Sequence, residues 1–201
     1  MKICMIGTGY VGLVSGVCFA DLGNDVICVD KDLKKIELLS KGKIPIYEPG
    51  LAEIVKRCRG KNLHFSNEIK EKIRTADMVF ISVNTPTKKK GIGAGKASDL
   101  KWVEACARQV AEFSKGHTIV VEKSTLPVRT AKTIKKILFN SQINKEDKNI
   151  NKTFSVLSNP EFLSEGNAIN DLQKPDRVLI GGDDENAINS LADLYLKWIP
   201  D

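Results

Sequence analysis

A glycine-rich turn between two apolar runs constrains the fold of this chain more than any other feature. Residues 3–6 are an apolar run typical of a buried parallel strand, and Gly7-Thr8-Gly9-Tyr10-Val11-Gly12 follows at once. A helical pattern then runs to Leu22. A second apolar run ends in Asp30, 18 residues after Gly12. Strand, turn, helix, strand and acid in this order predict a βαβ unit that binds a dinucleotide.

Each glycine of the turn has a distinct physical role in such a unit. We expect Gly7 to permit the tight turn, Gly9 to let a pyrophosphate approach the backbone, and Gly12 to let the helix pack closely on the strand. The free N–H groups and the positive end of the helix dipole would face the phosphates. A glycine-rich turn that binds no ligand is the alternative reading.

The acid at the end of the second run predicts which dinucleotide is bound. Asp30 would accept hydrogen bonds from both hydroxyls of an adenosine ribose, and it would repel a 2′-phosphate. This favours NAD over NADP. Three nearby cations weaken the preference, namely Lys31, Lys34 and Lys35.

The chain length and the cysteines limit the class of protein. With 201 residues, the sequence suits one domain, or one and a half at most. No apolar run approaches the ~20 residues of a membrane span, and a strand that starts at residue 2 leaves no room for a signal peptide. The five cysteines are odd in number and lack Cys-x-x-Cys spacing, which favours a reducing cytoplasm over a disulfide frame or a metal site.

The formal charge of +6 raises the question of a polyanionic partner. The lysines are scattered, aromatic residues are sparse, and no recognition-helix pattern is present. These features argue against nucleic acid. Small polyanionic ligands, or a solvated surface, explain the charge better.

Beyond Asp30 the chain alternates short apolar runs with helical patterns. We expect strands at residues 63–65, 78–83, 118–122, 154–157 and 177–181. Helices are expected at residues 33–41, 51–58, 66–73, 99–113, 127–139 and 186–198, with Ser66 and either Ser98 or Asp99 as N-caps. Residues 140–152 have the composition of a surface insertion. The alternation predicts an α/β fold of the Rossmann type, a doubly wound, mainly parallel sheet with helices on both faces.

Polar residues follow most of the expected strands, where ligands of such sheets bind. They are Gly7–Gly12, Asp30, Asn84–Thr87, Ser124-Thr125 and Asn159–Glu165. Loops also need polarity for solubility, so these positions alone do not prove a site. Glu161 and Glu165 could share one face at a helix start, which is a common solvated arrangement.

Six segments in one order carry a resemblance to a known family. They are residues 7–12, 45–51, 83–87, 122–129, 158–166 and 175–182. Together they closely resemble the UDP-glucose 6-dehydrogenases of the UDP-glucose/GDP-mannose dehydrogenase family. Residues 58–63 and 104–108 resemble the eukaryotic branch in particular. The resemblance covers essentially the whole chain.

The resemblance implies a four-electron oxidation of UDP-glucose to UDP-glucuronate, with two NAD+ reduced in turn. In this family a cysteine thiolate captures the aldehyde, and the thiohemiacetal is oxidised to a thioester that water hydrolyses. The resemblance makes Glu161 the acid/base group, which requires a raised pKa, and Thr125 a residue that positions the water. It assigns the substrate to Glu161, Phe162, Leu163, Ser164 and Glu165.

The same resemblance implies an NAD site, and the cysteine pattern predicts no metal site. It assigns the cofactor to Gly7, Thr8, Gly9, Tyr10, Val11, Gly12, Asp30, Lys35, Val83, Asn84, Thr85, Pro86, Thr87, Ser124, Thr125, Leu126 and Glu165. Lys35 stands where family members often carry an arginine, and a lysine lacks the planar fork of a guanidinium group.

The family's nucleophilic cysteine lies beyond the last residue of this chain. We therefore expect residues 1–201 to be the N-terminal NAD-binding domain, without the central helical and C-terminal UDP-sugar domains. We expect it to bind NAD without turning over UDP-glucose, and the full-length protein to be a cytoplasmic homo-oligomer with no nucleic-acid or membrane partner. A sister enzyme acting on GDP-mannose or a UDP-N-acetyl sugar and a catalytically silent NAD-binding module remain as alternatives.

Overall fold

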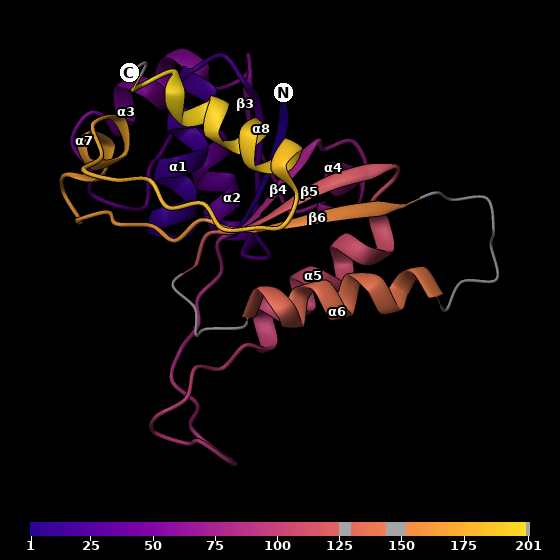
Figure 1. Cartoon of the computed structure of the whole chain (residues 1–201). Coiled ribbons are helices and arrows are strands. Elements are labelled where there is room, and N and C mark those ends of the chain that lie inside the picture. The colour runs from indigo at the N-terminus through magenta and orange to yellow at the C-terminus, as the bar shows by residue number, and fades with distance from the viewer. Residues whose placement is uncertain (125–129, 144–151, 200–201) are drawn as a thin grey trace.

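A single six-stranded parallel sheet forms the centre of the molecule. The computed structural model describes residues 1–124, 130–143 and 152–199 (Figure 1). The strands are β1 (Lys2–Ile6), β2 (Asp25–Val29), β3 (Leu63–Ser66), β4 (Met78–Ile81), β5 (His117–Glu122) and β6 (Thr153–Ser158). Their order in the sheet is β3-β2-β1-β4-β5-β6, with every pair parallel. This is the doubly wound Rossmann order, and it confirms the expected fold class.

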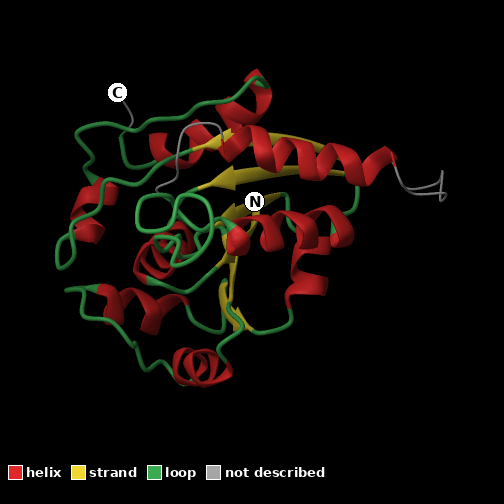
Figure 2. Cartoon of the chain, turned by 90° about the horizontal axis from the view of Figure 1, so that it is seen from below, coloured by secondary structure: helices red, strands yellow, loops and turns green. Residues whose placement is uncertain are grey.

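Helices cover both faces of the sheet. They are α1 (Tyr10–Asp21), α2 (Leu33–Ser40), α3 (Leu51–Cys58), α4 (Ile69–Arg74), α5 (Lys101–Phe113), α6 (Thr130–Ile143), α7 (Ala168–Gln173) and α8 (Glu185–Leu196). One core contains residues of α1, α3, α7 and α8, and the other contains residues of α4, α5 and α6. Figure 1 shows α5 and α6 on the side of the sheet opposite α1 and α8, and Figure 2 shows helices lying across the strands when the molecule is seen from below.

The alternation of side chains along each strand produces these two cores. In β1, Ile3 and Met5 point into the core beneath α1, whereas Cys4 and Ile6 point into the core beneath α5. Because both faces are covered, the central strands read as continuous apolar runs rather than alternating ones.

Helix α1 is buried on almost every side rather than along the single stripe that its sequence suggested. Residues 12–20 are all buried, because α3, α7 and α8 lie over α1. Phe19 of α1 stacks on Trp198 with ring centroids 5.7 Å apart, and it meets Tyr195 of α8 edge-on at 6.0 Å. The C-terminal helix therefore holds α1, and with it the glycine turn, in place.

The strand expected at residues 177–181 is absent. Only one antiparallel bridge forms there, between Ser158 and Gly181, with two backbone hydrogen bonds of 2.8 Å. The side chain of Asn159 donates to the carbonyl oxygen of Leu179 at 2.9 Å, so this carbonyl accepts a hydrogen bond from a side chain and not from the backbone of a neighbouring strand. Val178 and Ile180 still pack against the core, which explains the apolar pattern.

Several helix boundaries also differ from expectation. Ser66 is the last residue of β3, and α4 begins after Glu68, whose backbone N–H donates to the Ser66 hydroxyl at 3.0 Å. Asp99 accepts from the backbone N–H of Lys101 at 3.1 Å, but the N-cap of α5 is Leu100. Helix α6 reaches Ile143, so the first residues of the expected surface insertion are helical.

All five cysteines are free and buried, as expected for a chain without a disulfide frame. Among the described residues, no helix is long and apolar enough to cross a membrane.

Candidate functional site

The sheet reverses its strand order between β1 and β4, and the candidate site lies at the carboxyl ends of these two strands. A cleft of about 200 Å³ opens there, in the position where doubly wound sheets bind their ligands. It is lined by Gly9, Tyr10, Val11, Ser82, Val83, Asn84, Thr85, Ser124 and Glu161. All of these except Ser82 are residues that the sequence assigned to the site.

The three glycines of the turn are required for different reasons. Gly7 has a φ of +100°, and a Cβ on it would lie 2.4 Å from the carbonyl oxygen of Ser82. A Cβ on Gly12 would lie 2.0 Å from the carbonyl oxygen of Gly7. A Cβ on Gly9 would meet nothing closer than an oxygen of Asn84 at 3.9 Å. Packing therefore requires Gly7 and Gly12, whereas Gly9 leaves open space beside the cleft.

The first turn of α1 can bind an anion. Its N-cap is Gly9, which supplies no side-chain hydrogen bond to the first backbone N–H groups of the helix. These donors, together with the positive end of the helix dipole, lie next to the cleft. The open cradle at Gly9 and these donors fit the pyrophosphate of a dinucleotide.

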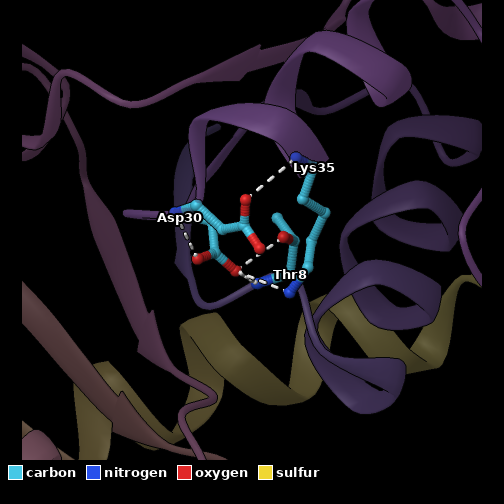
Figure 3. A network of polar contacts seen from close by, with 4 residues as sticks. Thr8, Asp30 and Lys35 are labelled. Atoms are coloured by element: carbon cyan, nitrogen blue, oxygen red, sulfur yellow. Dashed lines mark hydrogen bonds and ion pairs between the residues drawn. The ribbon is translucent and has the colours of Figure 1, made fainter.

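Asp30, at the end of β2, is linked to the glycine turn through Thr8 (Figure 3). One carboxylate oxygen accepts from the backbone N–H of Thr8 at 2.9 Å and from its hydroxyl at 2.7 Å. The same oxygen lies 3.3 Å from the ammonium group of Lys35, and the other oxygen accepts from the backbone N–H of Asp32 at 3.1 Å.

These contacts keep Asp30 ionised. Burial pushes the pKa of its carboxyl group upward, but the hydrogen bonds from Thr8 and Asp32 and the charge of Lys35 outweigh it, and the pKa lies below the usual value. An ionised carboxylate is a strong acceptor for ribose hydroxyls. The charge of Lys31 is directed elsewhere, because its ammonium group lies 3.5 Å from the ring centroid of Trp102.

The residues after β4 and β5 divide into those that line the cleft and those that do not. The hydroxyl of Ser124 donates to the carbonyl oxygen of Val83 at 2.8 Å, which joins the ends of the two strands. Pro86 and Thr87 are not part of the cleft lining. Thr87 forms a β-bridge with Ser98 at the base of the segment that extends away from the domain (Figure 1). Thr125 and Leu126 lie outside the described residues.

A second cavity, of about 470 Å³, adjoins the segment after β6. Its lining includes Glu161, Phe162 and Leu163 together with residues of α7 and the segment that follows it. Among the residues that the structure describes, Glu161 is the one shared by the linings of the two cavities. One of its carboxylate oxygens accepts from the backbone N–H of Leu163 at 2.8 Å.

The arrangement of the two glutamates differs from the helix start considered from the sequence. The segment that holds them is irregular, and the next helix, α7, begins only at Ala168. Glu165 is exposed and, like Ser164, lies outside both cavity linings. The backbone N–H of Ser164 donates to Asp171 at 2.7 Å. The structure therefore brings Glu161, Phe162 and Leu163 together, but not the last two members of the expected substrate set.

Sequence reasoning missed a buried polar network beside the second cavity. Lys123 is 2% exposed, and its ammonium group donates to the side-chain oxygen of Asn159 at 3.0 Å and to the hydroxyl of Tyr195 at 2.9 Å. The Tyr195 hydroxyl in turn donates to the same Asn159 oxygen at 2.6 Å. These residues are 36 and 72 positions apart along the chain, so no local pattern could reveal the network.

The sheet order, the glycine turn and the acid at the end of β2 define a dinucleotide-binding domain of the dehydrogenase type. Residues 1–199 match the sequence model of the UDP-glucose/GDP-mannose dehydrogenase family, NAD binding domain. The chain belongs to this family, and its cofactor is NAD.

The chain is similar to named relatives over its whole length. It is 47% identical over 207 residues to UDP-glucose 6-dehydrogenase 5 of Oryza sativa subsp. japonica, covering 100% of this chain and 42% of that protein. It is 50% identical over 207 residues to the UDP-glucose 6-dehydrogenase of Mus musculus, covering 99% and 40%. A ternary complex of GDP-mannose dehydrogenase from Pseudomonas aeruginosa superposes with a TM-score of 0.87 at 31% identity, covering 98% and 44%. The chain thus spans less than half the length of these proteins.

Proposed function

We propose that this chain is the NAD-binding domain of a UDP-glucose 6-dehydrogenase, and that the full-length protein oxidises UDP-glucose to UDP-glucuronate with two NAD+. The observation that carries the proposal is the position of Glu161. Its side chain borders both the cleft beside the glycine turn and the larger cavity next to α7. One carboxylate can therefore serve a cofactor on one side and a sugar substrate on the other.

The first cleft and its surroundings would hold NAD, which supplies hydride acceptance when bound. The N–H groups at the start of α1 would bind the pyrophosphate, and Asp30 would bind the adenosine ribose. Lys35 lies close enough to Asp30 to approach the same ribose. The cleft residues of the β4 and β5 ends, which include Val83–Thr85 and Ser124, would bind the nicotinamide half. For Gly7, Thr8 and Gly12 we propose an indirect role in shaping the turn.

The second cavity would hold the nucleotide sugar. Phe162 is 48% exposed, and the guanidinium group of Arg177 lies over its ring, 4.8 Å from the centroid. A cationic group over an exposed aromatic ring suits an anionic, ring-containing ligand. Glu161 would exchange protons with water or substrate at its carboxylate oxygens. We keep Thr125, Leu126, Ser164 and Glu165 as proposed site residues on the basis of the family motifs alone.

We propose that residues 1–201 bind NAD but do not turn over UDP-glucose on their own. A thiolate, not a thiol, captures an aldehyde. Burial raises the pKa of Cys18, Cys28 and Cys106 to about 12, and it also raises the pKa of Cys4 and Cys58. None of the five cysteines of this chain is therefore suited to act as the nucleophile.

Sequence identity to known enzymes favours UDP-glucose as the substrate over the nucleotide sugars of the sister enzymes. The chain is 47% and 50% identical to two UDP-glucose 6-dehydrogenases, but 31% identical to the GDP-mannose dehydrogenase. The free state of all five cysteines supports a reducing cytoplasm. Homo-oligomer formation by the full-length protein is proposed from the family resemblance, and the mass of the purified protein in solution tests it.

Turnover of the full-length protein tests the proposal. NADH formation is measured with UDP-glucose, GDP-mannose and UDP-N-acetylglucosamine, each with NAD or NADP. We expect two NADH for each UDP-glucose oxidised, little turnover of the other sugars, and loss of turnover in Glu161→Gln. A preference for another sugar would assign a sister activity, and no turnover with any of the sugars would indicate a silent binding module. Unchanged turnover in Glu161→Gln would rule out Glu161 as the acid/base group.

A further inference from the structure

Glu48 is a buried carboxylate that the proposed function leaves without a role. It lies in the proline-rich segment between α2 and α3, and it is 7% exposed. This segment is one of the six that carry the family resemblance, yet neither cavity lining includes Glu48. A carboxylate at such a depth has to be stabilised by several donors, because burial of an ionised group without partners is costly.

The donors that Glu48 accepts from come from two distant parts of the chain. One oxygen accepts from the hydroxyl of Tyr10, the first residue of α1, and from the backbone N–H of Gly166 at 3.0 Å. The other oxygen accepts from the backbone N–H of Ile169, in the first turn of α7, at 3.1 Å. The N–H of Gly166 also lies 2.6 Å from the Tyr10 hydroxyl oxygen.

These contacts connect the two halves of the candidate site. Tyr10 follows Gly9 and lines the cleft assigned to NAD. Gly166 lies near the end of the irregular segment that carries Glu161, two residues before α7, and its φ of +88° is in the left-handed region that favours glycine. Residues 10 and 166 are 156 positions apart, and residues 48 and 169 are 121 apart. The hydrogen bonds at Glu48 therefore fix the position of the glutamate segment relative to the glycine turn.

We propose that Glu48 is a positioning residue that, through Tyr10 and the backbone of Gly166 and Ile169, holds the Glu161 segment at its working distance from the cofactor turn. The inference rests on the proposed function, since it concerns the geometry of that reaction. A misplacement of about 1 Å at such a site is enough to lower turnover by about a hundredfold. Burial raises the pKa of the Tyr10 phenol, and the hydrogen bond to Glu48 raises it further, so Tyr10 stays a donor.

Two conservative substitutions in the full-length protein test this role. Glu48→Gln keeps the side-chain length but replaces one acceptor oxygen with an NH2 group, and Tyr10→Phe removes only the hydroxyl. Matched controls are Glu53→Gln and Tyr47→Phe, because Glu53 is exposed and Tyr47 is 83% exposed. The measurements are kcat and KM for UDP-glucose, the NAD dissociation constant of Glu48→Gln, and hydrogen exchange of the backbone amides from residue 163 to 169.

We expect Glu48→Gln to lower kcat by about tenfold to a hundredfold, with NAD binding near the wild-type value and faster exchange at Gly166 and Ile169. Tyr10→Phe should lower kcat in the same direction, and the controls should match the wild type. A variant that melts at a lower temperature but keeps its kcat well below melting would show a merely structural role and overturn the proposal.

The same experiment separates this inference from the proposed function. If the wild-type protein does not oxidise UDP-glucose, the proposed function fails, and amide exchange then decides whether Glu48 holds the segment. Faster exchange in both variants supports that role, and unchanged exchange overturns it.

Discussion

Thr8 donates two hydrogen bonds to a single oxygen of Asp30, one from its backbone N–H at 2.9 Å and one from its hydroxyl at 2.7 Å. Thr8 belongs to the turn after β1, and Asp30 directly follows the last residue of the neighbouring strand β2. This contact fixes the position of the Asp30 carboxylate, which would bind the ribose, relative to the glycine turn, which would bind the phosphates. Under the proposed function, phosphate binding and discrimination between NAD and NADP would thus depend on one connected unit.

Asp30→Asn should shift the cofactor preference. The substitution keeps the side-chain shape but removes the charge, and hydrogen bonds to charged groups contribute about 1.5–3 kcal/mol each. We expect NAD affinity to fall by about tenfold or more. NADP affinity should rise, because the cations Lys34 and Lys35 remain nearby. Calorimetric titration with both cofactors measures the ratio.

Asp25→Asn is the matched control, since Asp25 is exposed at the opposite end of β2. An unchanged ratio of NAD to NADP affinity in Asp30→Asn would rule out Asp30 as the discriminating residue.

Gly12→Ala should lower the stability of the fold, whereas Gly9→Ala should lower the affinity for NAD. The added Cβ at Gly12 would lie 2.0 Å from a backbone oxygen, so we expect a loss of about 1–3 kcal/mol or more in stability. Apart from the two adjacent residues, the atom nearest to an added Cβ at Gly9 is the side-chain oxygen of Asn84, at 3.9 Å. Gly9→Ala should therefore melt near the wild-type temperature and bind NAD more weakly.

Thermal unfolding and NAD titration of both variants provide the measurement. Gly181→Ala serves as a control, because its nearest neighbour would be a side-chain carbon at 4.0 Å. Normal NAD binding by a well-folded Gly9→Ala would contradict the role assigned to that glycine.

The sheet and the cofactor turn could be predicted from the sequence because their signals are local. The run of apolar residues in β1, the spacing of Gly7, Gly9 and Gly12, and the acid at residue 30 lie within one βαβ unit. The predicted strand at residues 177–181 was wrong because apolar alternation reports burial, and Val178 and Ile180 are packed without joining the sheet.

The polar networks could not be predicted because they depend on contacts between distant residues. Glu48 meets Gly166 across 118 positions, and Lys123 meets Tyr195 across 72. Glu48 did stand in a segment shared with the family, so a motif without an assigned chemistry was the one available signal. Helix α7 has only six residues, which is too short for its periodicity to be recognised.

Glu122 should make stability depend on pH near neutrality. Burial raises the pKa of its carboxyl group from 4.5 to about 7. Between these values the folded chain holds a proton that the unfolded chain has lost, so stability falls as pH rises through this range. The total change is of the order of 3 kcal/mol at most.

Glu122→Gln removes this titration. Urea unfolding at pH 5, 6, 7 and 8 should show that the variant gains stability relative to the wild type as pH rises. The gain should level off above the folded-state pKa of Glu122, which is about 7. Glu112→Gln changes an exposed position of α5, and its stability should vary with pH in the same way as that of the wild type. Parallel curves for Glu122→Gln itself would mean that the folded-state pKa is not raised.

Asn159→Leu should destabilise the chain far more than Tyr195→Phe. The side-chain oxygen of Asn159 accepts from both Lys123 and Tyr195, and its N–H group donates to Leu179. Leucine would remove all three of these hydrogen bonds and leave the Lys123 ammonium group, the Tyr195 hydroxyl and the Leu179 carbonyl oxygen each without that partner, at a cost of about 3 kcal/mol or more. Tyr195→Phe keeps the ring and the contact between Lys123 and Asn159, so about 1 kcal/mol is expected.

For a chain of this size each kcal/mol lowers the melting temperature by about 2–4 °C, so calorimetry resolves the two variants. Asn140→Leu, at an exposed position of α6, controls for the loss of an amide. Equal melting temperatures for Asn159→Leu and Tyr195→Phe would show that the Lys123 charge does not depend on Asn159. The buried network would then contribute through packing alone, and the segment that begins at Asn159 would be held by its backbone contacts to β5 and to Gly181.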